Sequence, residues 1–263
     1  MIGDWVKDYN LFASFHIKIK RYLHPDKKEM KNLTKKVLRK LLEAIDPSDD
    51  FHRQSYSQEG EDLILSQFID VQSTQKGFYV DVGAHHPFRL SNSYIFYKNS
   101  WSGICIDPNP ETKILFEKFR PRDIFIECGV SKEPSTLPYY MFNEAALNTF
   151  DAETANLRNG LQNYKLLEVK YIITDSLSSI LEKNAPKNKK FAFMTIDAEG
   201  YDLQVLESND WIKFRPEYLV VECSESNILN LQNNEVVSFL KSVGFYPYSK
   251  TGNSVIFQPI NKS

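Results

Sequence analysis

The sequence predicts an α/β protein built on a doubly wound sheet of about seven strands, with a carboxy-terminal antiparallel hairpin and an amino-terminal helical appendage. Strand and helix patterns alternate from about residue 57 onward, which is typical of a parallel sheet covered by helices. Two apolar runs, 78–82 and 103–107, carry the carboxylates Asp81 and Asp107 at or next to their ends. The final apolar runs are separated by a short connection containing Gly252, which predicts the hairpin.

The first fifty residues predict a basic amphipathic helix outside the main domain. The segment 18–40 is strongly basic, and Leu33, Val37 and Leu41 recur at helical spacing in and directly after it. Turn formers in 46–50 end this pattern, so we expect an appendage over 1–50 and a cofactor-binding domain over 51–263. We expect the cationic face of this helix to be exposed to solvent. The alternative is that it contacts an anionic membrane surface, a polyanionic substrate or a biosynthetic complex.

The elements of the main domain follow in order, beginning with a helix near 57–65 whose first residues are acidic. Strands are predicted at 78–82, 103–107, 123–130, 191–197, 216–223, 245–249 and 253–258, and helices at 109–119, 175–184, 201–209 and 234–243. Seven strands closing in a hairpin are typical of the Rossmann-like class I methyltransferase fold, whereas an NAD-binding sheet usually continues in parallel. Residues 131–172 fit neither pattern, and we expect an inserted loop or lid on the substrate side.

Composition excludes several classes of protein. A formal net charge of -2 gives no reason to expect a nucleic-acid partner. Cys105, Cys128 and Cys223 lie inside predicted strands and lack the spacing of a zinc site or redox pair, so we expect buried thiols. Because no secretory signal and no apolar run of membrane-spanning length is present, we expect a cytoplasmic protein.

The ends of the first two strands predict a cofactor site. Asp81, Gly83 and Ala84 form a tight turn after the first strand, with one glycine where the dinucleotide fingerprint has three. Asp107, followed by Pro108, stands where a carboxylate can accept both hydroxyls of a ribose. Capping of the next helix is the alternative role for Asp107.

A second group of residues predicts proton transfer or metal binding. Asp197 and Glu199 are two residues apart after an apolar strand, so both project toward the crevice, unless Glu199 only caps the next helix. His85 and His86 follow the first strand and can accept a proton, bind a metal or only shape the loop. Asp197, Glu199 and His86 are thus a candidate site for Mg²⁺ or Mn²⁺, and Glu222 is a weaker catalytic candidate.

Six motifs, taken in order over about residues 55–225, resemble the FkbM family of S-adenosylmethionine-dependent methyltransferases. They are Ser57-Gln-Glu-Gly-Glu-Asp62, Val80-Asp-Val-Gly-Ala-His-His-Pro87, Ser91-Asn-Ser93, Trp101-Ser-Gly-Ile-Cys-Ile-Asp-Pro108, Leu147-Asn-Thr-Phe150 and Ile196-Asp-Ala-Glu-Gly-Tyr-Asp202. Each motif is loose alone, but six in the right order are specific. Ser93 replaces the more usual Thr, and Asp202 replaces the Glu of many relatives.

The resemblance implies a class I fold that binds S-adenosylmethionine. It implies that the methionine part of the cofactor lies near 81–84 and that its ribose lies on Asp107. It also implies that the segment with Gln58 and Glu61 closes over the cofactor and that Asn92 and Ser93 belong to the cofactor site. Similar proteins usually methylate hydroxyls in pathways for surface polysaccharides, lipopolysaccharide or polyketide-type products.

The leading hypothesis is therefore an O-methyltransferase acting on a sugar hydroxyl of a surface glycan, or of its nucleotide- or lipid-linked precursor. A nicotinamide-dependent oxidoreductase on a Rossmann-type sheet is the first alternative. The second is a non-catalytic module that docks on a membrane or biosynthetic complex through residues 18–40. The sequence leaves open a homo-oligomer.

Overall fold

The computed structural model describes residues 34, 36, 37, 40, 52–187, 189–223 and 227–260. The chain divides into two compact units, Met1–Gln54 and Ser55–Ser263. In the first unit Thr34, Lys36, Val37 and Lys40 are helical, as the periodicity predicts, and the remainder of the predicted appendage over 1–50 lies outside the described residues. The fold below is that of the second unit.

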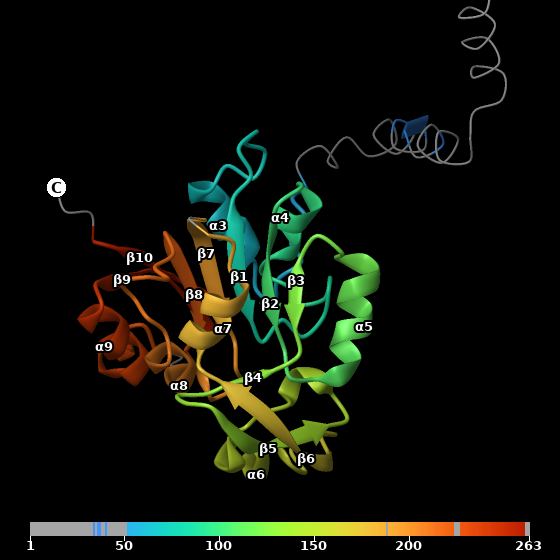
Figure 1. The fold of residues 1–263 in the computed structure, drawn as a ribbon, viewed down its shortest axis with the longest axis vertical. Helices are drawn as coiled ribbons and strands as arrows, with labels where there is room; N and C mark the ends of the chain where they lie inside the picture. Colours follow the sequence, from blue (N-terminus) through green and yellow to red (C-terminus); the bar gives the residue numbers. More distant parts are fainter. Residues whose placement is uncertain are drawn as a thin grey trace, which may run out of the picture. The chain divides into compact units, whose positions relative to one another are not determined.

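A seven-stranded sheet forms the centre of this unit (Figure 1). Its strands are β1 (Phe78–Val82), β2 (Ser102–Ile106), β3 (Ile124–Ile126), β7 (Phe191–Ile196), β8 (Tyr218–Glu222), β9 (Phe245–Lys250) and β10 (Ser254–Pro259). They are arranged in the order β3-β2-β1-β7-β8-β10-β9, and β10 alone runs opposite to the other six strands. The predicted class I methyltransferase sheet with a closing hairpin is thus confirmed.

Helices cover both faces of the sheet, because its strands are apolar on both sides. One core contains side chains of α7 (Leu177–Asn184), α8 (Asp202–Glu207) and α9 (Glu235–Ser242), together with the 3₁₀ helix η3 (Leu231–Asn233). The other contains side chains of α3 (Glu61–Phe68), α4 (Tyr94–Lys98) and α5 (Pro110–Phe119). The direction of the strand order reverses between β1 and its neighbours β2 and β7, which makes the carboxyl ends of these strands the expected ligand edge.

A second, smaller sheet corrects two of the predictions. It consists of β4 (Gly129–Val130), β5 (Ser135–Phe142) and β6 (Leu166–Asp175) in the order β4-β6-β5, with η2 (Ala145–Leu147) and α6 (Ala152–Arg158) between β5 and β6. The prediction of a loop over 131–172 was therefore wrong, while the predicted role of this stretch as a lid on the substrate side stays a prediction. The single strand predicted over 123–130 is in fact two short strands, because the chain leaves the large sheet after Ile126 and enters the small sheet at Gly129. Pro138 does not prevent β5 from forming, since β5 is an edge strand.

The cysteines follow the prediction in part. Cys105 lies in β2 and is buried, and Cys223 is buried directly after β8. Cys128 instead lies between β3 and β4 and is half-buried, so its predicted place inside a strand was wrong. Across the described ranges, no helix is both long and apolar enough to cross a bilayer.

Candidate functional site

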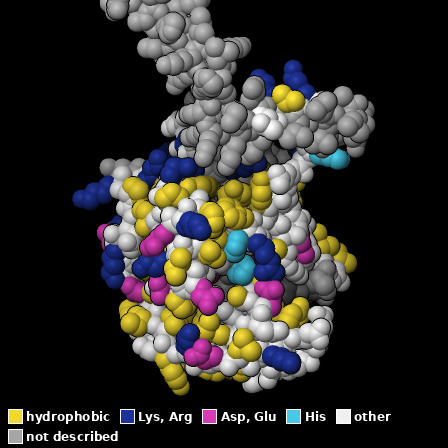
Figure 2. Space-filling view, turned by 90° about the vertical axis from the view of Figure 1, so that its right-hand side faces the viewer, with side chains coloured by type: hydrophobic (Ala, Val, Ile, Leu, Met, Phe, Trp, Pro, Cys, Tyr) yellow, Lys and Arg dark blue, Asp and Glu magenta, His cyan; other side chains and the backbone are white. Residues whose placement is uncertain are grey.

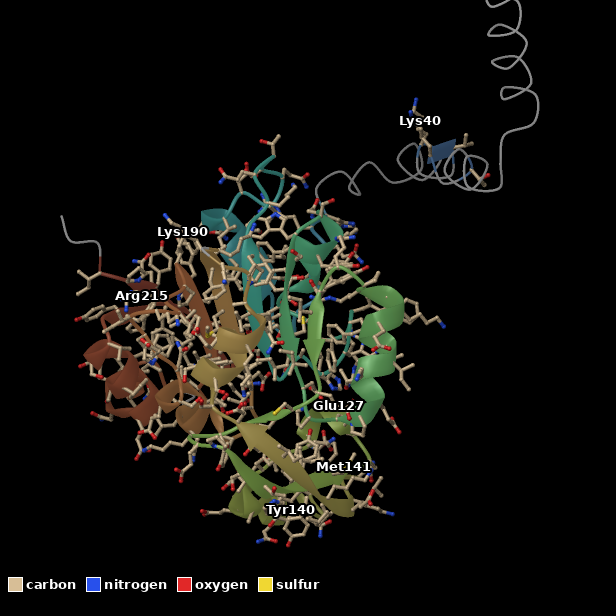
Figure 3. All side chains as sticks on the ribbon, in the orientation of Figure 1. Lys40, Glu127, Tyr140, Met141, Lys190 and Arg215 are labelled. Carbon is tan, nitrogen blue, oxygen red and sulfur yellow. The ribbon has the colours of Figure 1, made fainter. Side chains whose placement is uncertain are left out.

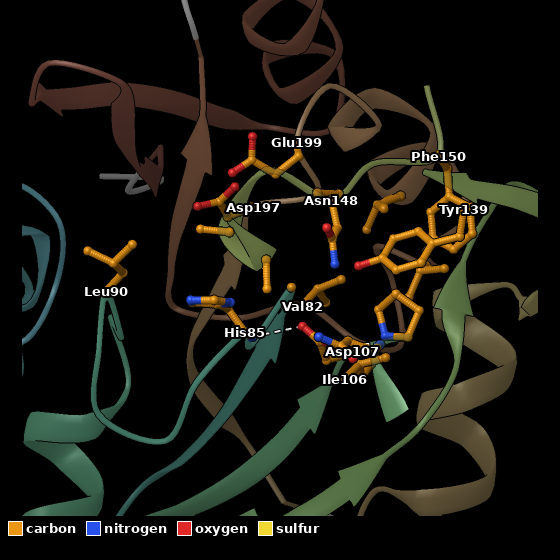
Figure 4. Close-up of a pocket in the computed structure, with 18 of the residues that line it drawn as sticks. Val82, His85, Leu90, Ile106, Asp107, Tyr139, Asn148, Phe150, Asp197 and Glu199 are labelled. Atoms are coloured by element: carbon orange, nitrogen blue, oxygen red, sulfur yellow. Dashed lines mark hydrogen bonds between the residues drawn. The ribbon is translucent and has the colours of Figure 1, made fainter. Parts of the chain in front are cut away.

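A pocket opens at the carboxyl ends of β1, β2 and β7, with the small sheet as its opposite wall (Figure 4). Seven of the predicted residues line it: Gln58, Gly83, His85, Asp107, Pro108, Asp197 and Glu199. The large sheet therefore brings the predicted cofactor turn, the predicted ribose carboxylate and the predicted catalytic pair together.

The turn after β1 is held in place by backbone contacts. The N–H groups of Gly83 and Ala84 both donate to the carbonyl of Ile106, at 2.9 and 3.1 Å. Gly83 has φ 78°, and a Cβ at this position would collide with the carbonyl oxygen of Asp197. Glycine is needed here for both reasons, since its backbone adopts this conformation freely and leaves room for β7.

Asp107 lies at the end of β2 in the position expected of a ribose ligand. Its side chain is only 5% exposed, and its two oxygens accept the backbone N–H groups of His85 and Asn109, each at 2.8 Å. Burial raises the pKa of this carboxyl to about 6, against the lowering effect of these hydrogen bonds. Because a carboxylate offers about four acceptor positions, Asp107 can still accept two ligand hydroxyls.

The other predicted cofactor residues lie behind the pocket wall. Glu61 accepts from Thr251 Oγ1 at 2.8 Å, and Asn92 donates to Thr195 Oγ1 at 2.9 Å. Asp81 accepts from Ser93, whose hydroxyl in turn accepts from the buried Arg120. These side chains, and Ala84, do not line the pocket. In this structure they fix the loops around it, and direct cofactor contact by them stays a prediction.

Three carboxylates meet at the ends of β7 and β8. Among the residues that the structure describes, Asp197, Glu199 and Glu222 form the group whose metal-ligating atoms all lie within 4.8 Å of one another. Burial, together with the neighbouring carboxylates, raises the pKa of Asp197 and brings those of Glu199 and Glu222 to about 8. Asp197 Oδ1 is buried and has no hydrogen-bond partner, so a donor from a ligand would satisfy it.

Two neighbours hold this carboxylate cluster in place. Arg158 of α6 forms an ion pair with Glu199 at 2.5 Å, and Glu199 adopts a left-handed φ of 53°. Asp202 accepts the backbone N–H groups of Ala198 and Gly200, at 2.8 and 3.2 Å. Because α8 has no side-chain cap, the alternative role of helix capping does not describe Glu199, and Asp202 instead fixes the turn that precedes the helix.

The two histidines have different surroundings. His85 lines the pocket, and burial, with a smaller contribution from the Arg89 charge, lowers its pKa to about 4, so it is neutral at pH 7. His86 lies off the pocket, and its Nδ1 accepts the backbone N–H groups of Phe88 and Arg89, each at 3.1 Å. The predicted metal set is corrected accordingly, since Glu222 rather than His86 completes the group. Figure 2 shows histidine, basic and acidic side chains side by side on this face of the molecule.

The sequence profile of the FkbM methyltransferase domain matches residues 81–247. The chain belongs to this family. The family and the fold are those of S-adenosylmethionine-dependent methyltransferases, which decides against the nicotinamide alternative. No curated protein sequence is detectably similar to the chain.

Solved structures similar to this FkbM chain are distant in sequence. The methyltransferase FkbM of Methylobacillus flagellatus KT is 15% identical over 70% of this chain and 43% of that chain, with a TM-score of 0.42. A TehB-like SAM-dependent methyltransferase from Corynebacterium glutamicum is 10% identical over 84% and 97%, with a TM-score of 0.38. A 1,6-didemethyltoxoflavin-N1-methyltransferase from Burkholderia thailandensis, solved with S-adenosylhomocysteine, is 13% identical over 86% and 88%, with a TM-score of 0.37. This FkbM chain thus spans less than half the length of the Methylobacillus protein.

β5 and the connection between β5 and β6 supply three pocket residues of this FkbM chain that sequence reasoning missed: Tyr139, Asn148 and Phe150. Leu90, in the loop between β1 and α4, lies across the pocket from them (Figure 4). Asn148 is only 6% exposed, and its Oδ1 accepts the N–H of Phe142 at 2.8 Å. Its Nδ2 forms no hydrogen bond of normal length and angle, and the Tyr139 hydroxyl is its polar neighbour in the pocket wall. The sequence signal that could have identified Asn148 and Phe150 as pocket residues is the family motif 147–150, which contains both.

These features fit S-adenosylmethionine. The pocket presents one unpartnered buried donor on Asn148, one unpartnered buried acceptor on Asp197 and a ribose-type carboxylate on Asp107. Buried polar atoms are rarely left unsatisfied, so a polar ligand is expected between them. The aromatic side chains of Phe78 and Tyr79 in β1 are core residues and do not line this pocket, with 3% and 0% exposure.

A second pocket adjoins the carboxylate cluster on the side away from Asp107. It is lined by residues of α6, α8, α9 and the end of β8, among them Arg158, Asp202, Glu222 and Asn234. Asp197 and Glu199 line the first pocket and Glu222 lines the second, so the carboxylate cluster forms the boundary between them. An acceptor molecule in the second pocket would meet these carboxylates before it meets the cofactor.

Proposed function

We propose that this FkbM protein transfers a methyl group from S-adenosylmethionine to a hydroxyl of a sugar, in a surface glycan or in its nucleotide- or lipid-linked precursor. The observation that supports this proposal best is the unpartnered Asp197 Oδ1 at the boundary between two pockets. A hydroxyl is a suitable partner for that oxygen, because it donates one hydrogen bond and must lose one proton on methylation.

The residues have separate roles in this proposal. When bound, the cofactor supplies an activated methyl group. Asp107 holds the ribose hydroxyls, and Asn148 Nδ2 donates to a further cofactor acceptor. In its deprotonated form Asp197 accepts the hydrogen bond of the acceptor hydroxyl and takes its proton, while Arg158 orients the neighbouring Glu199. Because burial and the neighbouring carboxylates raise the pKa of Asp197, this reactive form becomes more populated as pH rises. Positioning of the acceptor oxygen accounts for most of the remaining catalysis.

Labelled S-adenosylmethionine, presented with a panel of nucleotide sugars and oligosaccharides, tests cofactor and acceptor class together. With the acceptor in hand, we expect Asp197→Asn to lower kcat by roughly 10²- to 10⁴-fold, the usual contribution of a general base. Affinity for S-adenosylhomocysteine should change little. Asp175→Asn is the control, because Asp175 is also a largely buried carboxylate but lies at the end of β6, outside both pockets, and bonds Lys183. Transfer at the wild-type rate by Asp197→Asn would exclude the proposed role.

A divalent cation is a second candidate for the carboxylate cluster, favoured by the 4.8 Å spacing of its ligand atoms. Mg²⁺ and Mn²⁺ prefer such oxygen ligands, and a bound ion would orient the acceptor hydroxyl. Electron paramagnetic resonance of Mn²⁺ with the protein measures binding without activity. If the site binds the ion, Glu222→Gln should abolish the bound signal and Asp175→Asn should keep it.

The predicted cytoplasmic location, the absence of a nucleic-acid partner and membrane contact through residues 18–40 remain predictions. Calorimetry with S-adenosylhomocysteine and with NAD provides the simplest check of the cofactor. Tight binding of NAD alone would overturn the proposed function.

A further inference from the structure

Strand β6 carries an uninterrupted row of exposed apolar side chains. Leu167, Val169, Tyr171 and Ile173 are 67%, 41%, 74% and 73% exposed. They occupy alternate positions, so all four lie on one face of the strand. Tyr140, opposite Val169 in the register, is among the side chains of the small sheet that lie farthest from the large sheet (Figure 3). Contiguous exposed apolar surface of this kind marks an interaction site.

One edge of β6 is open as well. β6 pairs with β5 along nearly its whole length but with β4 only at Thr174 and Asp175. No other described strand lies along that second edge from 167 to 172. The carbonyl of Ile173 accepts from Cys128 Sγ, which precedes β4, and therefore points to this edge. Alternate residues face the same edge of a strand, so the backbone groups of Val169 and Tyr171 also point there.

The sequence around Val169 is complementary to itself. In an antiparallel pair centred on Val169 of two chains, Glu168 lies opposite Lys170 and Leu167 lies opposite Tyr171. Opposite charges and apolar pairs at directly opposed positions stabilise a sheet, whereas like charges destabilise it. A register centred on Lys170 would instead place two lysines opposite each other, so the charges select the register centred on Val169.

We propose that this edge pairs with a second copy of the same chain, β6 against β6, so that the strand order β5-β6-β6-β5 runs continuously across a two-fold axis, with each β4 keeping its short pairing at Thr174 and Asp175. Such an interface is closed, because each copy uses the same residues. Within one chain Lys170 lies 3.3 Å from Glu168, and both side chains are at the surface. Exchanging this contact for the same contact between chains costs little, because exposed ion pairs contribute little to stability.

The pairing leaves the pocket open. Tyr139 of β5 is buried and lines the cofactor pocket from the other face of the small sheet, where its neighbour in the register is Lys170. The interface uses the strand edge and the ends of the exposed side chains. The inference is therefore independent of the acceptor and of the methyl-transfer proposal. With about five paired residues per chain, the interface belongs to the small, reversible class.

Sedimentation of the full chain over a range of concentrations tests this inference. The wild type should show a reversible monomer–dimer equilibrium. Lys170→Glu and Glu168→Lys should each weaken self-association roughly tenfold or more, because each places like charges opposite each other twice. Lys213→Glu is the control: it changes an exposed lysine that pairs with Glu182 outside β6, and it should leave the equilibrium unchanged.

Mixing the two variants is the decisive experiment. Lys170→Glu carries Glu at 168 and 170, whereas Glu168→Lys carries Lys at both positions, so each pair of opposed charges between them is attractive. The mixture should therefore form a heterodimer at concentrations where each variant alone is monomeric. Recovery in the mixture also shows that both variants are folded. A wild type that stays monomeric, single variants that dimerise normally or a mixture that gains nothing would each overturn the inference.

Discussion

The unpartnered amide of Asn148 gives the sharpest test of how the pocket holds its cofactor. The N–H of Phe142 can only donate, so the Asn148 atom that it meets at 2.8 Å must be Oδ1, which leaves Nδ2 as the group in the pocket wall. Asn148→Asp keeps the acceptor for Phe142 and replaces the free donor by an oxygen. The ligand group facing it then loses a hydrogen bond and stays desolvated, which costs about 1 to 3 kcal/mol. We therefore expect the Kd for S-adenosylhomocysteine to rise about 5- to 150-fold.

Isothermal titration calorimetry with S-adenosylhomocysteine, in the absence of any acceptor, measures this change. Asn209→Asp is the control for a buried amide outside the pocket. Asn209 is 8% exposed, its Nδ2 donates to the Phe214 carbonyl at 3.2 Å and its Oδ1 has no partner, so the substitution changes a buried amide without touching the pocket wall. The control should bind as the wild type does. If Asn148→Asp also binds with unchanged affinity while remaining folded by circular dichroism, the donor does not face the cofactor.

Three further predictions concern the carboxyl end of the sheet and its support. Because burial raises the pKa of Asp107 to about 6, its charged form is lost as pH falls below that value; calorimetry should show weaker S-adenosylhomocysteine binding at pH 5 than at pH 8, and a flatter profile in Asp107→Asn. Arg120→Leu leaves Asp123 buried without its 2.7 Å partner and should lower the free energy of unfolding in urea by about 3 to 5 kcal/mol, with partial recovery in Arg120→Leu/Asp123→Leu. Gly83→Ala should lower the Tm or prevent folding, because the added Cβ meets the Asp197 carbonyl at positive φ; an unchanged Tm would contradict this packing.

Most of the large sheet could be predicted because its strands carry their own signal. β1, β2 and β7 are buried on both faces, so they read as apolar runs ended by carboxylates. The small sheet was missed for the opposite reason. β6 alternates apolar with polar residues, and β5 contains Pro138, so neither resembles a buried strand. Their pairing also joins residues that lie between 24 (Phe142 and Leu166) and 39 (Ser135 and Thr174) positions apart.

The candidate site likewise contains some residues that the sequence predicts and others that it does not. Gly83, Asp107 and Asp197 follow directly from strand ends, because parallel strands deliver their last residues to one edge. Asn148 has no such position in the sequence, since only its hydrogen bond to Phe142 turns its amide toward the pocket. Glu222 was a weak candidate in the sequence and joins the carboxylate cluster because β8 lies beside β7.

The sequence by itself therefore determined the family, the order of the main strands and the residues that stand at their ends, since these depend on local patterns of burial and on short motifs. Only the tertiary structure decided which of those residues share a wall of the pocket and which hold the loops behind it. It alone paired Glu222 with Asp197, left Asn148 Nδ2 and Asp197 Oδ1 without partners and exposed one edge of β6. The physical reason is that hydrogen-bond satisfaction and desolvation depend on neighbours in space, which a single sequence does not specify.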